Sequence, residues 1–246
     1  MKRLLHPREK PHRTETALDD IRIDTSDTET LAQGAYRTLR HDIIAGRRPP
    51  GERLRIGKLK TIYGIGPTPL REALQKLSQD GLVVAEDNRG FAVADLDPVE
   101  FADLNVARTA LEKEALRLSM AQGDDAWEAR VVAASYIMQK EDAALSALLE
   151  KVPDSWERAN AAFHTALVSA CGSTWLLRLR MQLHDLCERY RRASVYQRIG
   201  ARDLAAEHAA ISAAVLNRDA ALACTLIEHH FARTADALAP APKDRS

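Results

Sequence analysis

Hydrophobic and polar positions first follow a helical period at Leu31, after a polar stretch of mixed charge over residues 1–29 that we expect to be a flexible leader. From there the pattern predicts three short helices and then a β-hairpin: helices at 31–44, 56–63 and 68–81, and strands at 82–85 and 91–94. The strands flank a polar turn that contains Gly90. Three helices followed by a hairpin are typical of a winged helix-turn-helix, which we place at residues 30–95.

A second domain begins at Asp97, which is a good N-cap because Pro98 follows it and Glu100 lies three residues on. Beyond it the pattern predicts helices and no strand: 98–121, 125–150, 155–171, 174–195, 203–217 and 220–237. One sharp apolar stripe is expected to pack: Leu176, Leu179, Leu183, Leu186 and Tyr190. We therefore expect a mostly α protein whose second domain, residues 97–238, is an antiparallel bundle of six or seven helices, followed by a disordered tail at 239–246.

The composition mainly excludes certain kinds of protein, such as membrane-spanning and disulfide-rich ones. The 46% hydrophobic and 28% charged residues are ordinary for a soluble globular protein. Cys171, Cys187 and Cys224 are odd in number and lack CxxC spacing, so we expect small core residues and no disulfide framework. No apolar run approaches the roughly 18 residues of a membrane span, and no apolar stretch follows the basic start to make a signal peptide. We expect a cytoplasmic protein with no membrane partner.

Positive charge is concentrated in the first domain, although the whole chain has a net charge of zero. Residues 31–76 hold ten Lys or Arg against three Asp or Glu. The same segment carries the runs PGERL (50–54) and PTPLREAL (67–74), and GLV follows at 81–83. In this order and spacing the motifs resemble the GntR family of bacterial regulators over residues 31–94. The resemblance implies binding to double-stranded DNA.

The recognition helix and the wing are the DNA-binding elements that this resemblance implies. Arg71 lies one turn into the helix, where a guanidinium can address O6 and N7 of a guanine. Thr68 can bond a phosphate or a base edge, and Arg89 with Gly90 at the wing tip can enter the minor groove. Phosphate contacts are expected from three more basic residues: Arg55, Lys58 and Lys60. For each lysine the alternative is plain surface solvation.

One departure from the family pattern changes how the operator would be read. Members commonly carry Ser-Arg or Thr-Arg where this chain has Gly66-Pro67, and that arginine usually contacts the operator. Base readout is therefore expected to depend more heavily on Arg71, while Glu72 braces the helix.

The helical half resembles the FadR-type C-terminal domain, or FCD domain, which is the effector-binding module of one GntR subfamily. Four short motifs carry the resemblance: Arg108-x-x-Leu111-Glu112, Phe163-His164, Glu207-His208 and His230. Further runs are similar to members that control glutarate and aminobutyrate utilisation: 163–167, 171–173 and 185–191. The resemblance implies a bundle that binds a small molecule and thereby controls the first domain.

In this subfamily three histidines, and an acidic residue four positions before the first of them, hold a divalent metal. The matching positions here are His164, His208, His230 and Asn160. Asn160 and His164 share a helix face, and three imidazoles suit Zn²⁺ or Ni²⁺. An amide oxygen is a weaker donor than a carboxylate, so the alternatives are reduced metal affinity or a metal-free site. In a metal-free site the histidines bond to the core or directly to a ligand.

Arginines of the bundle indicate the class of effector. Arg108 is similar to the residue that meets an effector carboxylate in this subfamily, and Asn160 and Arg191 are further candidate contacts. Arg180 shares a helix with Arg191, close to one face, although for both we favour an exposed ion pair. A metal and an arginine in an apolar bundle would select a small carboxylic acid, with dicarboxylates included.

We therefore expect a homodimeric transcription repressor that binds a near-palindromic operator and responds to a small carboxylate. Two alternatives stay open. In one, the helical half only dimerises and binds no effector. In the other, the histidines belong to a metalloenzyme, which the sequence disfavours because it has no HExxH signature and because the winged domain would be unexplained.

Overall fold

The structure is a computed structural model that describes residues 30–86, 90–145, 153–194 and 202–238. These residues form nine helices and one antiparallel hairpin: α1 Leu31–Ile44, α2 Ile56–Tyr63, α3 Pro67–Gln79, β1 Val83–Glu86, β2 Gly90–Val93, α4 Pro98–Gln122, α5 Asp125–Leu145, α6 Asp154–Val168, α7 Thr174–Ser194, α8 Leu204–Leu216 and α9 Ala220–Leu238. The mostly helical fold class is confirmed. The expected leader, the tail and the wing-tip residue Arg89 lie outside the described residues.

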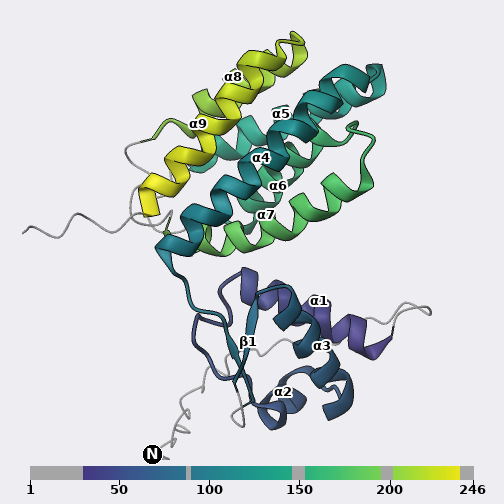
Figure 1. Cartoon of the computed structure of the whole chain (residues 1–246), viewed down its shortest axis with the longest axis vertical. Coiled ribbons are helices and arrows are strands. Elements are labelled where there is room, and N and C mark those ends of the chain that lie inside the picture. The colour runs from purple at the N-terminus through teal and green to yellow at the C-terminus, as the bar shows by residue number, and fades with distance from the viewer. Residues whose placement is uncertain (1–29, 87–89, 146–152, 195–201, 239–246) are drawn as a thin grey trace, which may run out of the picture.

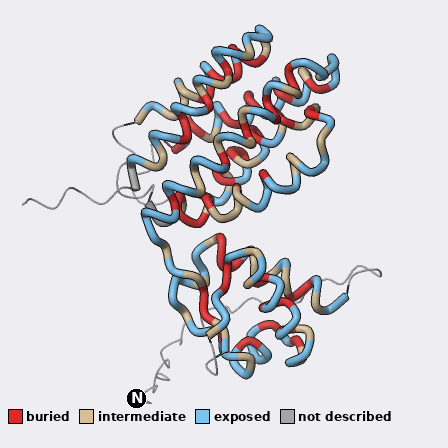
Figure 2. The backbone as a smooth tube through the Cα atoms, viewed as in Figure 1, coloured by how far each residue is buried: buried red, intermediate tan, exposed pale blue. Residues whose placement is uncertain are grey.

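The N-terminal domain forms around a small apolar core that α1, α3 and the hairpin share. Thr30 starts α1 with a capping box, because its hydroxyl accepts the Gln33 amide at 3.2 Å and its own amide donates to the Gln33 side chain at 3.0 Å. Leu39, Leu70 and Leu74 are completely buried between the helices. This packing fixes α3 and leaves its opposite face to solvent (Figure 2).

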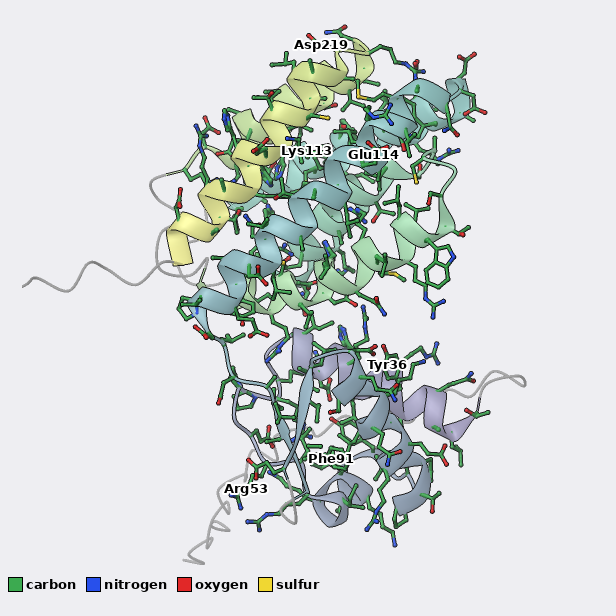
Figure 3. All side chains as sticks on the ribbon, in the orientation of Figure 1. Tyr36, Arg53, Phe91, Lys113, Glu114 and Asp219 are labelled. Carbon is green, nitrogen blue, oxygen red and sulfur yellow. The ribbon has the colours of Figure 1, made fainter. Side chains whose placement is uncertain are left out.

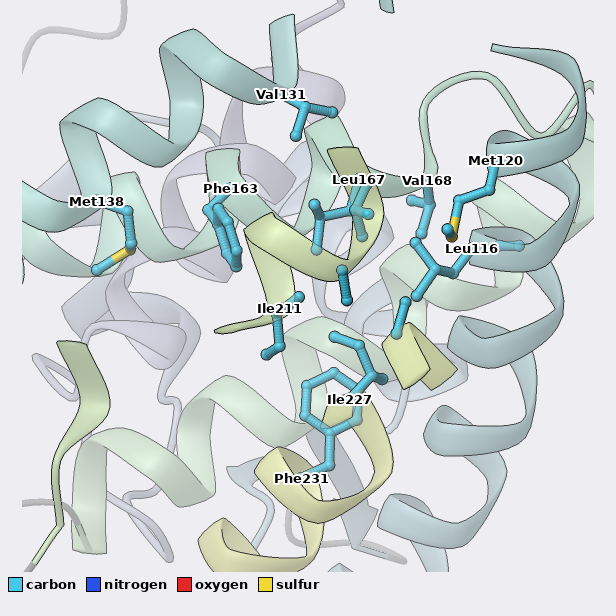
Figure 4. Close-up of a cluster of buried hydrophobic side chains, with 14 of the residues drawn as sticks. Leu116, Met120, Val131, Met138, Phe163, Leu167, Val168, Ile211, Ile227 and Phe231 are labelled. Atoms are coloured by element: carbon cyan, nitrogen blue, oxygen red, sulfur yellow. The ribbon is translucent and has the colours of Figure 1, made fainter. Parts of the chain in front are cut away.

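The C-terminal domain is a helical bundle (Figure 1). In this bundle α4 packs against both α9 and α7, and α5 packs against α6. Its large buried side chains fill the centre between the helices, as Figure 4 shows for Phe163, Ile211 and Phe231. The predicted helix bounds differ from the observed ones mainly at two ends. The 155–171 helix ends at Val168, and the predicted end of α5 at residue 150 lies beyond the described part of that helix. Among the described helices none combines the length and apolarity of a membrane span.

Helix α7 lies at the boundary between the two domains, directly above α1 in Figure 1. Arg40 of α1 forms an ion pair with Asp185 of α7, and Leu186 packs against the N-terminal core beside Gly81. Burial raises the pKa of the Asp185 carboxyl to about 6, despite the opposing effect of Arg40. The C-terminal domain therefore contacts the N-terminal domain through residues of α7.

The same helix holds the segment that connects the domains. The Arg189 guanidinium donates to the backbone carbonyl of Ala94, and the Asp97 amide donates to the Tyr190 hydroxyl at 3.2 Å. The Tyr190 ring stacks on Phe101 at a centroid distance of 4.7 Å. The connection between the last strand and α4 is thus fixed by three contacts from the C-terminal half of α7.

The apolar stripe predicted on α7 packs only in part. Leu186 and Tyr190 pack as expected, but the Leu179 side chain is 43% exposed. The face of α7 that is buried in the bundle is largely polar: Arg180, His184, Cys187 and Arg191. A stripe of leucines normally marks the core face of a helix, whereas here the core face carries the side chains of a polar site.

Candidate functional site

A hollow of about 450 Å³ lies between α3, the start of α2 and the second strand. Its lining includes Arg71 from α3, Arg55 at the N-cap of α2, and Gly90 at the start of β2, all from the predicted DNA-binding set. Arg53 and Phe91 also line it and lie at the end of the domain that is remote from the bundle (Figure 3). The positively charged hollow therefore faces away from the sensor domain and is open to a partner.

The first turn of α3 has few amide donors. The N-cap is Gly66, which has no side chain to cap the helix, and Pro67 and Pro69 have no N–H. Thr68 is the residue between them that can offer an amide, and its side chain is exposed. Lys58 is also exposed and lies 3.7 Å from a Glu52 carboxylate oxygen. An anion at this helix end would therefore depend on Thr68 and on side chains more than on a row of amides.

Three histidines from three helices meet inside the bundle. His164 of α6, His208 of α8 and His230 of α9 are buried, and each offers a ring nitrogen within 4.8 Å of the other two. Their ring centroids are 5.0 to 6.0 Å apart. Asn160, one turn before His164 on α6, is buried as well.

The hydrogen bonding and burial of these histidines fit a metal ion. His164 Nδ1 and His208 Nε2 are buried and have no hydrogen-bond partner among the described residues. Burial lowers the pKa of His164, and it lowers that of His230 to about 3, so both imidazoles are neutral at neutral pH. Neutral, convergent imidazoles with unused nitrogens are the donor set that Zn²⁺ or Ni²⁺ requires.

Arg108 of α4 is a buried guanidinium that forms no ion pair with a described carboxylate. It lies 4.0 Å from the centroid of the Phe231 ring, and one terminal nitrogen is 3.3 Å from His184 Nδ1. Its Nε has no hydrogen-bond partner in the described part of the chain, and burial lowers the pKa of Arg108. A buried cation without an anion is costly, so this arrangement favours an anionic ligand.

The other two arginines of the bundle differ from Arg108. Arg180 binds Glu112 through two hydrogen bonds of 2.7 and 2.9 Å, and Arg191 forms an ion pair with Glu157. All four of these side chains are buried. Their charges are therefore already matched inside the protein.

The C-terminal half of the chain matches the FCD domain over residues 103–233, and the N-terminal half matches the gntR family of bacterial regulatory proteins over residues 31–93. The chain is also 39% identical to the HTH-type transcriptional repressor GlaR of Escherichia coli K12 over 200 residues, which are 80% of this chain and 90% of that protein. The chain belongs to the GntR family. It is accordingly a transcription regulator with a DNA-binding domain and an effector-binding domain, and not an enzyme.

Other relatives agree with this assignment. The GntR chain is 36% identical to the HTH-type transcriptional regulator BphR of Paraburkholderia xenovorans LB400 over 209 residues, which are 85% of each protein. The solved structure of E. coli McbR/YncC matches its fold with a TM-score of 0.71 at 19% identity, over 85% of this chain and 97% of that one. The fold of this chain is thus also found in a solved structure.

Two features of the GntR bundle correct the sequence-based expectations. The ion pairs of Arg180 and Arg191 are buried, whereas exposed pairs were favoured. His184 was not among the expected site residues, but it is buried and contacts Arg108. Periodicity failed here because the apolar face of α7 is not its core face.

Four residues beside the sites were missed by sequence reasoning. Arg53 and Gln75 line the basic hollow, and Gln75 could have been found because it lies one turn after Arg71 on the recognition helix. Asp142 and Glu207 bind the Nδ1 atoms of His208 and His230. Glu207 stands next to His208 in the chain, but nothing in the local pattern marks Asp142.

Proposed function

We propose that this GntR regulator is a repressor whose operator affinity is controlled by a small carboxylate, bound in the helical bundle with the help of a divalent metal. The observation that carries the proposal is the buried guanidinium of Arg108, which has no carboxylate partner among the described residues and lies near the histidine cluster. A carboxylate is the anion that best complements a guanidinium in both shape and charge.

In this proposal, different residues of the bundle bind the carboxylate and the metal. Arg108 would hold one carboxylate oxygen, and His184 would keep the guanidinium in place through its 3.3 Å contact. His164, His208 and His230 would hold the metal, with Asn160 as a further ligand to metal or effector. A bound Zn²⁺ or Ni²⁺ would supply a Lewis-acidic position for a carboxylate oxygen.

Arg191 would distinguish effectors that have two carboxylates from effectors that have one. This residue is already paired with Glu157, so the second carboxylate of a dicarboxylate would reach it only by exchanging with Glu157. A monocarboxylate would need no such exchange. Comparing acids of equal length with one or two carboxylates therefore tests whether Arg191 contacts the effector.

Dimerisation is the second part of the proposal, with another copy of this chain as the partner. Trp175 and Leu179 lie one turn apart on the outer face of α7, 65% and 43% exposed, and α7 packs beside α4. Exposed aromatic and aliphatic side chains on adjacent helices are typical of subunit interfaces. A two-fold dimer would present two wings to a near-palindromic operator.

Coupling between the sites would pass through α7. His184 contacts Arg108 on one side of the helix, and the next two residues, Asp185 and Leu186, contact the N-terminal domain. An anion that repositions Arg108 would therefore act on a helix that already touches α1 and the end of α3. The wings would change their relative placement, which lowers operator affinity.

Thermal unfolding of the purified full-length chain tests the ligand part of the proposal. The panel compares small mono- and dicarboxylates, glutarate among them, with and without Zn²⁺ or Ni²⁺. We expect a selective rise in Tm for one class of acid, lost in Arg108→Ala and His208→Ala and kept in the control Arg117→Ala, whose side chain is exposed on the same helix as Arg108. No shift with any acid or metal would favour the alternative, in which the helical half only dimerises.

A further inference from the structure

The candidate metal ligands are neutral, which leaves a charge problem inside the bundle. Three imidazoles and the Asn160 amide bring no negative charge to a divalent cation, and all four side chains are buried. Removing a doubly charged ion from water costs several kcal/mol unless nearby anions compensate it. The compensating charge should therefore lie close behind the histidines.

Asp142 of α5 lies behind His208. One carboxylate oxygen is 2.7 Å from His208 Nδ1, and the other accepts the Trp156 indole N–H at 2.8 Å. Asp142 is only 2% exposed, so water screens its charge very little. Because a carboxylate accepts the Nδ1 proton, the lone pair of His208 is left on Nε2, which is the buried nitrogen without a partner.

Glu207 of α8 contacts His230 but shares its Nδ1 with Arg202, whose terminal nitrogen lies 3.1 Å from that atom. The Glu207 carboxylate lies 2.8 Å from His230 Nδ1, and it is also bound by Arg202 at 2.9 Å and by Arg233 at 2.8 Å. These arginines fix the carboxylate but also neutralise much of its charge. Each carboxylate therefore lies directly behind a candidate metal ligand and brings negative charge close to the site.

We propose that Asp142 and Glu207 are positioning residues for the metal site, and that Asp142 supplies the negative charge that Asn160 does not. The inference rests on the metal-assisted part of the proposed function. Asp142 fixes the His208 ring with Nε2 turned toward the other histidines and raises its basicity as a ligand. Glu207 holds the His230 ring in place together with Arg202.

Metal titration of the metal-free, full-length protein tests this. Co²⁺ binding is followed by its visible absorption, and Zn²⁺ affinity is measured by competition with a chromophoric chelator. We expect Asp142→Asn, which keeps an oxygen for Trp156, to weaken binding by about 10- to 100-fold, and Glu207→Gln to weaken it as well. The matched control is Glu141→Gln, whose carboxylate instead accepts from the Ser155 hydroxyl.

A rescue separates charge from folding. Asn160→Asp should tighten metal binding in the parent protein and restore most of the affinity lost in Asp142→Asn, which a purely structural role of Asp142 would not allow. The Tm of each metal-free variant shows that it is folded, and Glu207→Gln keeps the test usable if Asp142→Asn does not fold.

The outcomes distinguish the inference from the proposal on which it rests. If the parent binds Co²⁺ and Zn²⁺ but Asp142→Asn and Glu207→Gln bind them as tightly as Glu141→Gln does, the positioning role is wrong while the metal site stands. If the parent binds neither ion, the metal-assisted part of the proposed function fails and the inference fails with it.

Discussion

The two domains use arginine in opposite ways. In the N-terminal domain, Arg53, Arg55 and Arg71 are exposed around one open hollow. In the bundle, Arg108 and Arg180 are only 4% exposed. An exposed guanidinium is solvated at little cost and stays available to a phosphate or a base, whereas a buried one requires an anion.

The buried arginines themselves fall into two kinds. Arg180 and Arg191 have internal carboxylate partners, and Arg108 has none among the described residues. A buried ion pair between two helices holds them together. A buried guanidinium without a carboxylate partner lowers the stability of the ligand-free protein but is available to bind an anion. Each of the following predictions tests one side of this contrast.

Breaking a matched pair should have the largest effect. Arg180→Met leaves Glu112 buried without its two hydrogen bonds, so the free energy of unfolding should fall by about 3 to 5 kcal/mol. Urea unfolding followed by tryptophan fluorescence reports on the bundle, because all three tryptophans lie beyond residue 97. The exposed pair of Arg117 with Glu114 gives the control, where Arg117→Met should cost less than about 1 kcal/mol. Equal losses for the two variants would contradict the contrast.

Acid should destabilise the bundle before the winged domain. Burial lowers the pKa of His164 and His184, and it lowers that of His230 to about 3, so the folded state stays neutral while the unfolded chain takes up protons below its ordinary pKa of 6.5. Stability is therefore full above pH 6.5 and falls as the pH drops, by about 1.4 kcal/mol per histidine for each pH unit.

Metal-free protein at pH 7.5, 6.5 and 5.5, unfolded with urea, measures this slope. His184→Leu should reduce the slope, because burial lowers the pKa of His184. A stability that is flat between pH 7.5 and 5.5 would show that the buried imidazoles do not resist protonation.

Removing the unmatched arginine should act in the opposite direction. Arg108→Met replaces a buried cation, whose Nε has no partner among the residues that the structure describes, with an apolar side chain. We expect the ligand-free protein to become more stable by about 1 kcal/mol while the acid-dependent rise in Tm disappears. Thermal unfolding with and without the acids of the panel measures both. A destabilisation as large as that of Arg180→Met would mean that Arg108 is a structural group.

On the exposed side, Arg71→Ala should change DNA binding and leave stability almost unchanged. Loss of a bidentate contact to guanine should weaken binding to an operator selected from random DNA by about 10- to 100-fold and relax specificity at one position. Fluorescence anisotropy measures the affinity, with the exposed bundle residue Arg130→Ala as control. The recognition-helix assignment would be wrong if Arg71→Ala bound like the parent.

Lys58→Ala should produce the smallest effect. As a phosphate contact it should weaken binding to all sequences alike and reduce the slope of log affinity against log salt by about 1. Anisotropy titrations at several salt concentrations give the slope. An unchanged slope would support the simpler interpretation, in which Lys58 is a solvated surface residue.

The sequence alone predicted most elements of the fold because their ends carry local signals. Asp97 with Pro98 marks the start of α4, and the Asp97 side chain caps that helix as expected, although Glu100 binds the Tyr190 hydroxyl instead of the N-cap amide. Gly64 ends α2 with a positive φ of 66°, which favours glycine. Such signals depend on a few neighbouring residues, so they can be read without the tertiary structure.

The polar interior was harder to predict, since it depends on distant residues. Motifs located Arg108 and the three histidines. They did not show which arginine lacks a carboxylate partner, because Arg180 and Arg191 of α7 pair with Glu112 and Glu157 of other helices. Asp142 lies 66 residues from His208 in the chain and carries no local signal. Amphipathic patterning failed on α7 because it assumes an apolar core face.

The contact of Leu186 with the N-terminal core has a consequence for domain recombination. A DNA-binding module that completes its own core can be joined to unrelated sensors, as evolution often does with such modules. Here Leu186 of the effector-binding domain packs against the apolar core of the N-terminal domain beside Gly81. A chimaera that keeps residues 30–95 would therefore need a compatible apolar residue at position 186 of its new sensor, and the two halves are expected to have diverged as a pair.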